Sequence, residues 1–342
     1  MEPAVGAWCG GSSVVFRLRD HDQRLSSVRL SSAAFRDPPE FCYLPASRTW
    51  ELRLSRPAVH RIEYRLELVH PDGSRESVLD PDNPRRTGDS SELWCVDYRE
   101  PDWLHLPQVA GDWRDVYLPL PAVRAEMVAR VWSPDSGTDR VVVAHDGPDF
   151  QRHGELARYL AAMIGAGRVA PCHLVLLPPG ERFEWYSANP AYARALTVDV
   201  LPKIAAELGT DRPVVGIGAS LGALAMLHAQ RRHPGAFEGL FLQSGSFFQP
   251  RHDRQESGFR RYLRIVRFTG QVLRSAGGPP VPAALTCGLA EENRHNNRDM
   301  ARALRLQGYP VELAEVPDAH NWTGWRDALD PHLTGLLQTV FI

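Results

Sequence analysis

A serine between two glycines is the first residue in this chain whose surroundings point to chemistry. Residues 218–222 read Gly-Ala-Ser-Leu-Gly, a G-x-S-x-G pattern centred on Ser220. A short β-branched run, 212–217, precedes the pattern, and a small-residue run that favours a helix, 223–229, follows it. A strand, a sharp turn and a helix in this order are typical of a nucleophile elbow. The pattern predicts that Ser220 is a nucleophile, although a strand-to-helix turn without chemistry uses the same glycines.

An activated serine also needs hydrogen-bond donors for the oxyanion that forms on its substrate. Leu221 begins the predicted helix, so its main-chain N–H is the expected first donor. The second donor normally comes from the loop after an upstream strand, which we place at 140–144. The main chain around Gly147, directly after Asp146, is therefore the second candidate, although a glycine there is equally explained by a turn alone.

The general base should follow the last strand of the sheet. Residues 309–316 form a strand-like run, and the loop behind it carries His320. This position fits the chain order of α/β-hydrolases, which is serine, then acid, then histidine. His295 and His332 are alternatives, but both fall in predicted helices, where structural roles suit them better.

The acid that orients the base should lie between the serine and the histidine in the sequence. A strand-like run at 281–287 opens into a loop with two adjacent carboxylates, Glu291 and Glu292. A carboxylate at this strand end can reach an imidazole from the side. The residues alone leave the choice between the two open.

Six motifs follow one another from about residue 128 to the C-terminus. They are Asp146-Gly147, Arg182-x-Glu184, Gly218-x-Ser220-x-Gly222, Gln243-Ser244-Gly245-Ser246, Gly288-x-x-Glu291 and His320-Asn321-x-x-x-Trp325-Arg326. In this order they resemble the enterochelin-esterase branch of the putative esterase superfamily. This branch contains serine hydrolases that open the trilactone of catecholate siderophores, beside esterases with other substrates, and mycolyltransferases share its fold.

The resemblance implies a triad of Ser220 as nucleophile, His320 as base and Glu291 as orienting acid. The family often has Gly-Gly-His-Asp around the histidine, whereas this chain has Asp-Ala-His-Asn at 318–321. The departure keeps the base but makes Asp318 an alternative acid or a hinge residue.

The resemblance also implies a substrate-binding role for three charged residues near the site. These are Asp146, Arg182 and Glu184. Arg182 and Glu184 would equally serve to pair with each other and brace their loop.

The first third of the chain needs a fold of its own, because 342 residues exceed what one core usually supports. Apolar and charged residues alternate along 61–69, which predicts a half-buried strand in an antiparallel sandwich. The resemblance implies that this domain is immunoglobulin-like. We therefore expect a β-sandwich at 1–107 and an α/β-hydrolase domain with a mostly parallel sheet at 108–342, joined near 101–115. The strands expected in the sandwich are 13–18, 28–30, 50–54, 61–69 and 77–79.

Composition excludes several classes of partner. The formal net charge of −2 gives no global basic field for nucleic acid, and no run is long and apolar enough to span a membrane. Residues 1–13 lack the features of a signal peptide. The five cysteines are scattered and odd in number, so we expect free thiols and a cytoplasmic location. No cysteine or histidine cluster has metal spacing, so no metal is expected.

The segment 251–274 carries seven arginines against two acids and has apolar residues at helical spacing. We expect an amphipathic helix where hydrolases insert caps over their active sites. Its basic face would be either ordinary solvated surface or a cap that attracts an anionic substrate.

These observations predict a serine esterase that works through an acyl-enzyme and needs no cofactor. Its partner would be a small-molecule ester, and the resemblance implies a siderophore-like one. Acyl transfer to an acceptor other than water is the alternative within the superfamily. A binding protein with a vestigial hydrolase site is the alternative from another class. No oligomeric state is predicted.

Overall fold

The computed structural model describes residues 6–275, 277 and 279–341, and these residues form two compact units. The first unit holds the chain up to Arg99 together with two later segments, Gly288–Glu291 and Val316–Gly324. The second unit holds Glu100–Cys287, Glu292–Glu315 and the chain from Trp325 onward. This division differs in detail from a single boundary at residue 107, because two loops of the C-terminal region belong to the first unit.

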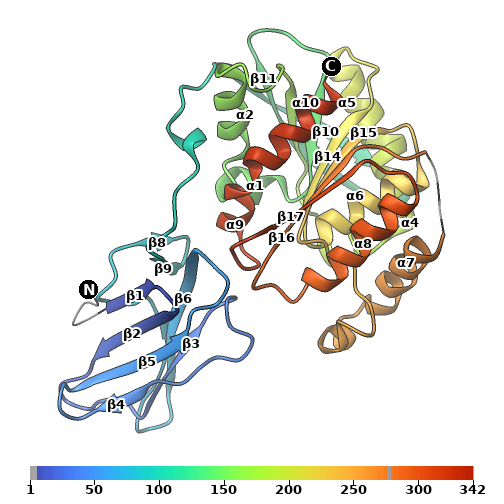
Figure 1. The fold of residues 1–342 in the computed structure, drawn as a ribbon. Helices are drawn as coiled ribbons and strands as arrows, with labels where there is room; N and C mark the ends of the chain where they lie inside the picture. The colour runs from blue at the N-terminus through green and yellow to red at the C-terminus, as the bar shows by residue number, and fades with distance from the viewer. Residues whose placement is uncertain (1–5, 276, 278, 342) are drawn as a thin grey trace. The chain divides into compact units, whose positions relative to one another are not determined.

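Two antiparallel sheets make up the first unit, in the strand orders β1-β2-β5-β4 and β3-β6-β9-β8, with β7 paired to β6 (Figure 1). Their inner faces share one hydrophobic core, as expected for a sandwich. The strands are β1 Gly6–Gly10, β2 Ser13–Arg19, β3 Ser27–Ser31, β4 Cys42–Leu44, β5 Thr49–Ser55, β6 Arg61–Val69, β7 Arg75–Val78, β8 Arg86–Thr87 and β9 Ser90–Trp94.

All five strands predicted for this unit are present, and β6 has the predicted bounds. The prediction missed four others: β1, β4, β8 and β9. Strand β9 begins with Ser-Ser-Glu, a polar sequence that does not look like a strand, although Ser91 and Glu92 are buried. Buried polar groups need hydrogen-bond partners, and these partners come from residues far away in the sequence.

A disulfide joins Cys9 in β1 to Cys95 directly after β9. The prediction that all cysteines are free thiols is therefore wrong for this pair, while Cys42 and Cys172 are free thiols. Scattered spacing could not reveal the pair, because the antiparallel sandwich brings together residues 86 positions apart in sequence. The predicted cytoplasmic location rested on free thiols, and the disulfide removes that support.

Removing the disulfide should destabilise the sandwich. A crosslink over a separation of 86 residues restricts the unfolded chain, and its loss costs about 4.6 kcal/mol in the chain-entropy model. The Cys9→Ala/Cys95→Ala double variant should therefore unfold at lower denaturant concentration than the parent, and a reducing agent should have the same effect on the parent. Cys42→Ala is the matched control, since Cys42 is exposed and free. Identical transitions in the parent and the double variant would contradict the expectation.

The second unit is built on one eight-stranded sheet in the order β10-β11-β13-β12-β14-β15-β16-β17. The strands from β13 through β12, β14 and β15 to β16 pair in parallel, and β10 and β11 are antiparallel additions at one edge. This is the predicted mostly parallel α/β sheet. The strands are β10 Gly111–Leu120, β11 Ala125–Pro134, β12 Val141–Ala144, β13 His173–Leu176, β14 Val214–Ala219, β15 Phe237–Gln243, β16 Ala283–Gly288 and β17 Val311–Val316.

Helices connect these strands and cover the sheet, as Figure 1 shows. The strands β12 to β16 are buried along their length apart from the half-buried Glu238 in β15, which requires cover on both faces. The helices are α1 Gly147–Arg152, α2 Leu156–Gly165, α3 Arg182–Trp185, α4 Pro190–Arg194, α5 Leu201–Leu208, α6 Leu221–Arg232, α7 Tyr262–Arg274, α8 Arg294–Leu306, α9 Trp322–Asp327 and α10 Thr334–Val340. Short one-turn segments include η3 Ala195–Val200, η4 Arg254–Gly258 and η5 Leu329–Leu333.

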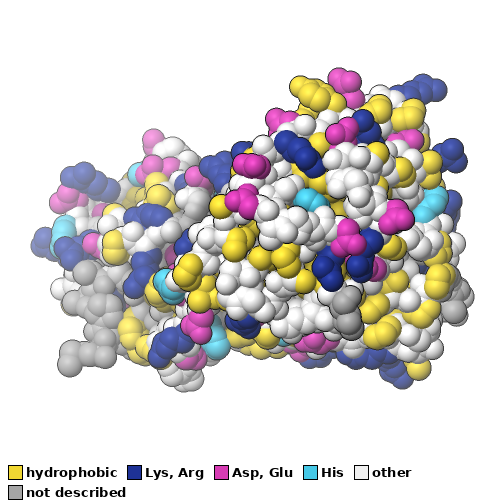
Figure 2. Space-filling view, turned by 90° about the horizontal axis from the view of Figure 1, so that it is seen from above, with side chains coloured by type: hydrophobic (Ala, Val, Ile, Leu, Met, Phe, Trp, Pro, Cys, Tyr) yellow, Lys and Arg dark blue, Asp and Glu magenta, His cyan; other side chains and the backbone are white. Residues whose placement is uncertain are grey.

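The surface seen in Figure 2 carries basic and acidic side chains interspersed with apolar atoms, in keeping with the small net charge. Among the described residues, no helix has the length and apolar character needed to cross a bilayer. Within the same residues, no group of three or more His, Cys, Asp or Glu could hold a metal ion. The start of the chain, where no signal peptide was expected, lies partly outside the described residues.

Candidate active site

Ser220 sits in a strained turn between the end of β14 and the start of α6. Its backbone has φ 56° and ψ −121°, a region that side-chain-bearing residues rarely occupy. A hydrogen bond from the Ser220 N–H to the carbonyl of Gln243 in β15 fixes this turn at 2.8 Å. Strained conformations of this kind persist where the surroundings impose them, and they gather at functional sites. The strand, turn and helix predicted from the G-x-S-x-G pattern are thus present.

Close approach requires glycine at position 218 and leaves little room for a side chain at position 222. A β-carbon on Gly218 would overlap with the main chain of Gly222. A β-carbon on Gly222 would lie 3.3 Å from the Asp146 carboxylate and from the β-carbon of His145. Strand β14, helix α6 and the loop after β12 therefore meet at the serine.

The two main-chain N–H groups predicted to bind the oxyanion have different surroundings in the structure. Leu221 is the first residue of α6, where an N–H has no acceptor within the helix and the helix dipole favours negative charge. The Gly147 N–H instead donates to the Leu177 carbonyl at 2.8 Å. Pro148 has no N–H, and the Asp146 N–H donates to the Tyr186 hydroxyl at 3.3 Å.

Gly147 therefore does not offer its N–H to a substrate. A β-carbon at this position would lie 2.6 Å from main-chain atoms of Leu176 in β13. The glycine is there so that the loop after β12 can pack against the neighbouring strand. The structural explanation of this glycine is the correct one.

The predicted acid and base are in direct contact within the first unit. Glu291 Oε2 lies 2.9 Å from His320 Nδ1, and Glu291 Oε1 accepts a hydrogen bond from the Gly288 N–H at 2.8 Å. The Glu291 side chain is 1% exposed, whereas that of His320 is 35% exposed. The buried carboxylate thus fixes the orientation of the His320 ring through Nδ1.

The neighbouring carboxylate is turned to solvent. Glu292 is exposed, and its Oε2 accepts a hydrogen bond from the Gln255 side chain at 2.9 Å. Of the two carboxylates that the sequence left open, Glu291 is the one in contact with His320.

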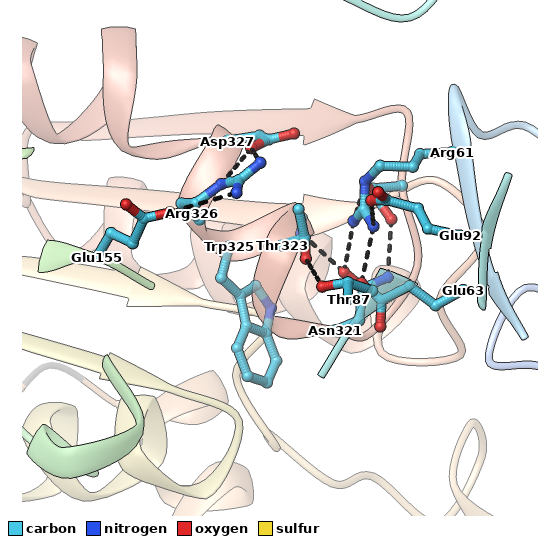
Figure 3. Close-up of polar contacts among 12 residues, drawn as sticks. Arg61, Glu63, Thr87, Glu92, Glu155, Asn321, Thr323, Trp325, Arg326 and Asp327 are labelled. Atoms are coloured by element: carbon cyan, nitrogen blue, oxygen red, sulfur yellow. Dashed lines mark hydrogen bonds and ion pairs between the residues drawn. The ribbon is translucent and has the colours of Figure 1, made fainter. Parts of the chain in front are cut away.

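Asp318 is engaged elsewhere, with a buried arginine of the sandwich. Arg61, whose side chain is fully buried, donates from Nη2 to Asp318 Oδ2 at 2.9 Å. The same guanidinium pairs with Glu63 and Glu92 and donates to Asn321 at 2.8 Å (Figure 3). Asp318 Oδ1 accepts from the Ala319 N–H and the Asn321 amide. Asp318 therefore braces the loop that carries His320.

His295 and His332 have the structural settings that the sequence suggested. His295 lies in α8, exposed, with its ring stacked on His252. His332 lies in η5 and its Nδ1 contacts the Glu312 carboxylate at 2.9 Å.

Asp146 and Arg182 form a bidentate ion pair in the second unit. Arg182 Nε and Nη2 donate to the two carboxylate oxygens of Asp146 at 2.8 and 2.9 Å. Asp146 is 1% exposed, so its carboxylate braces Arg182 and is closed to a substrate. The Arg182 side chain is 29% exposed, so a substrate-binding role fits Arg182.

Glu184 ties helix α7 to the short helix α3. Its carboxylate pairs with Arg261 and, at 2.7 Å, with Arg264. Burial raises the pKa of Glu184, but the hydrogen bonds and charges of Arg264 and Arg261 outweigh it and hold the pKa below the ordinary value. Arg182 and Glu184 therefore do not pair with each other. The predicted amphipathic helix is present as α7, and Glu184 fastens it.

Two buried histidines should make the second unit sensitive to acid. Burial lowers the pKa of His145 and of His228 to about 3. Arg232 and Arg264 also lower the pKa of His228. The unfolded chain binds a proton at each histidine as the pH falls below about 6.5, and the folded chain does not. Each histidine therefore lowers the free energy of unfolding as the pH falls from 6.5 towards 3.

Replacing His228 should weaken this dependence. Its ring packs edge-on against Phe268, so His228→Phe keeps an aromatic side chain. The free energy of unfolding should then fall less steeply between pH 6.5 and 4, by about 1.4 kcal/mol per pH unit. Urea unfolding at several pH values measures both slopes. Parallel curves for parent and variant would show that His228 is protonated in the folded protein.

Comparisons with known proteins agree with this architecture. The ferric enterobactin esterase from Salmonella typhimurium superposes with a TM-score of 0.74 at 17% identity, covering 96% of this chain and 94% of that chain. The enterobactin esterase from Shigella flexneri, in the presence of enterobactin, gives 0.73 at 18% identity, with the same coverage. A ferulic acid esterase gives 0.55 at 16% identity, over 67% of this chain and 98% of that chain. At these identities the likeness shows the fold.

Comparison with curated proteins finds no match. The model of the family described as Putative esterase matches residues 122–336, which is more than half of the chain. The matched range contains the strained serine turn and both members of the contact between Glu291 and His320. This protein belongs to the Putative esterase family.

Proposed function

We propose that this esterase is a serine hydrolase that works through an acyl-enzyme on Ser220. The observation that carries the proposal is the strained turn at Ser220, with a positive φ at a residue that is not glycine. A turn of this kind projects a hydroxyl from the end of a strand towards the start of a helix. Ser220 combines φ 56° with ψ −121°, which lies outside the left-handed helical region where other residues tolerate a positive φ. Glycine would adopt this conformation without the strain.

The chain order supports Glu291 and His320 as the other members of the triad. Ser220 follows β14, Glu291 follows β16 and His320 follows β17, and all three strands belong to one sheet. Serine, acid and histidine in this order are typical of α/β-hydrolases. The 2.9 Å contact between Glu291 and His320 supplies the pair of orienting acid and base.

In the proposed reaction His320 takes the proton of the Ser220 hydroxyl, whose oxygen attacks the ester carbonyl carbon. The Leu221 N–H binds the oxyanion of the tetrahedral intermediate. The alcohol leaves with the proton that His320 returns, and Ser220 keeps the acyl group. His320 then takes a proton from water, which attacks the acyl-enzyme, and Ser220 leaves with that proton. Glu291 holds the imidazole in the required tautomer and stabilises the imidazolium.

A siderophore-like ester is the substrate that we propose. The support is the likeness to esterases of enterobactin over 96% of the chain, together with an exposed cation at the site. The Asp146 carboxylate lies next to Gly222 and fixes the position of Arg182. The exposed part of the Arg182 side chain is therefore placed to bind an anionic group of the substrate. A screen of enterobactin, linear catecholate esters and short p-nitrophenyl esters tests this assignment. Turnover of the p-nitrophenyl esters without turnover of any catecholate ester would overturn the substrate while keeping the chemistry.

The same screen with added acceptor alcohols separates hydrolysis from acyl transfer. Free acid as the sole product supports hydrolysis, and a new ester supports a transferase. Tight binding of an ester without any turnover would support a binding protein with a vestigial site.

The basic face of α7 should assist capture of an anionic substrate. Arg260, just before α7, and Arg267, within it, are exposed, whereas Arg264 is tied to Glu184. The Arg260→Gln/Arg267→Gln variant should lower kcat/KM for an anionic catecholate ester several-fold and leave a neutral p-nitrophenyl ester unchanged. Added salt should reproduce this loss in the parent enzyme, because the field is screened over about 8 Å at physiological ionic strength. Equal kcat/KM values in parent and variant would leave the face as solvated surface.

A further inference from the structure

The loop after β15 places a second serine hydroxyl against the nucleophile. Ser246 Oγ lies 3.1 Å from Ser220 Oγ, and the Ser246 N–H donates to the Ser220 carbonyl at 3.1 Å. Ser220 is half-buried, whereas Ser246 is only 2% exposed. The sequence motif at 243–246 belongs to the family resemblance, but it gave Ser246 no role.

This loop is held rigidly from its first residue onward. Ser244 has φ 48°, and its N–H donates to the Thr286 carbonyl in β16 at 2.7 Å. Its Oγ accepts from the indole N–H of Trp325 at 2.9 Å, and its carbonyl accepts from the Asn293 amide at 3.2 Å. These hydrogen bonds hold Ser244 in the left-handed conformation, which its surroundings therefore impose.

The next residue is clamped by one side chain from α8. Asn297 Oδ1 accepts from the Gly245 N–H at 3.0 Å, and Asn297 Nδ2 donates to the Gly245 carbonyl at 2.9 Å. Asn297 is fully buried. A β-carbon on Gly245 would collide with the ring of Phe247. The loop therefore holds the Ser246 hydroxyl at a fixed position beside Ser220.

The direction of the hydrogen bond between the two hydroxyls follows from burial. Within the part of the chain that the structure describes, the Ser246 hydroxyl makes its hydrogen bond with Ser220 Oγ. If Ser220 donated to Ser246, the buried proton of Ser246 would be left without an acceptor, which is costly. Ser246 therefore donates to Ser220, and the proton of Ser220 stays free for the base.

We propose that Ser246 is a further catalytic residue whose hydroxyl donates to Ser220 Oγ and stabilises the negative charge that develops on this oxygen. The proposal rests on the proposed function of Ser220. During acylation the Ser220 proton passes to His320, while Ser246 keeps its own proton. During deacylation the bond between the acyl carbon and Ser220 Oγ breaks, and the electron pair returns to an oxygen that still accepts from Ser246. Hydrogen bonds to a charged oxygen are stronger than those to a neutral one, so the contact favours the transition state.

The rate at which a fluorophosphonate probe labels Ser220 tests this role without knowledge of the substrate. Ser246→Ala removes the donor and should slow labelling on the order of ten- to a hundred-fold. Ser246→Cys fills the same space with a weak donor, so it should also label more slowly than the parent. Ser133→Ala is the matched control, because Ser133 lies in β11 and its hydroxyl contacts His173 in β13. This variant should label at the parent rate. Thermal unfolding of each variant shows whether it is folded.

Each outcome separates the role of Ser246 from that of Ser220. A parent protein that does not label at Ser220 would overturn the proposed function itself. A parent that labels, with Ser246→Ala labelling equally fast, would overturn only the role of Ser246. Slow labelling in Ser246→Ala with the full rate in Ser246→Cys would show that the site needs volume and not a donor, which also overturns the role. If the alanine variant does not fold, the cysteine variant decides.

Discussion

Ser220→Ala and His320→Ala will each lower kcat for ester hydrolysis on the order of ten-thousand-fold or more, with the fold retained. The nucleophile and its base act as a unit, so losing either removes the covalent route. The double variant should therefore be little slower than either single variant. Steady-state rates with a p-nitrophenyl ester measure all three variants, and circular dichroism monitors the fold.

Losses that add in the double variant would contradict this expectation. Additive losses would mean that the two residues act in separate steps, so that His320 is not the base for Ser220. His332→Ala is the matched control, because His332 contacts Glu312 outside the proposed triad. It should keep the parent rate.

Glu291→Gln should lower kcat by several thousand-fold. The amide keeps the shape of the side chain but removes the charge beside His320 Nδ1, at 2.9 Å. An amide also lets the imidazole take the wrong tautomer, and the corresponding change in serine proteases costs about ten-thousand-fold. The effect should fall on kcat, since Glu291 is buried away from a substrate.

Glu292→Gln is the control variant for Glu291→Gln, because the Glu292 side chain is exposed and accepts a hydrogen bond from Gln255. It should remain within about twofold of the parent rate, as expected for a surface substitution. A dead Glu292→Gln enzyme with an active Glu291→Gln enzyme would show that the acid is the other carboxylate.

The parts of the fold that sequence predicted well are those set by local pattern. The strand before Ser220 and the helix after it follow from β-branched and small residues around two glycines. Strand β6 follows from strict alternation of apolar and charged residues. These signals are short-range, so no knowledge of partners is needed.

The parts that the sequence did not reveal depend on distant partners. The hairpin of β10 and β11 was missed because β10 begins with the charged residues Asp112, Arg114 and Asp115 and contains a proline, Pro119. The ion pair between Asp146 and Arg182 joins the loops after β12 and β13, which become neighbours only in the sheet. The Gly147 N–H was misassigned for the same reason, since its acceptor is the carbonyl of Leu177 at the end of β13.

The clearest test of the serine mechanism is the mass of the acyl-enzyme trapped during turnover. The enzyme is mixed with a p-nitrophenyl ester, quenched in acid within the first turnovers and digested for peptide mass spectrometry. The acyl group should be found on Ser220, and Ser220→Ala should carry none. Turnover at the parent rate by Ser220→Ala, or an acyl group on another residue, would contradict it.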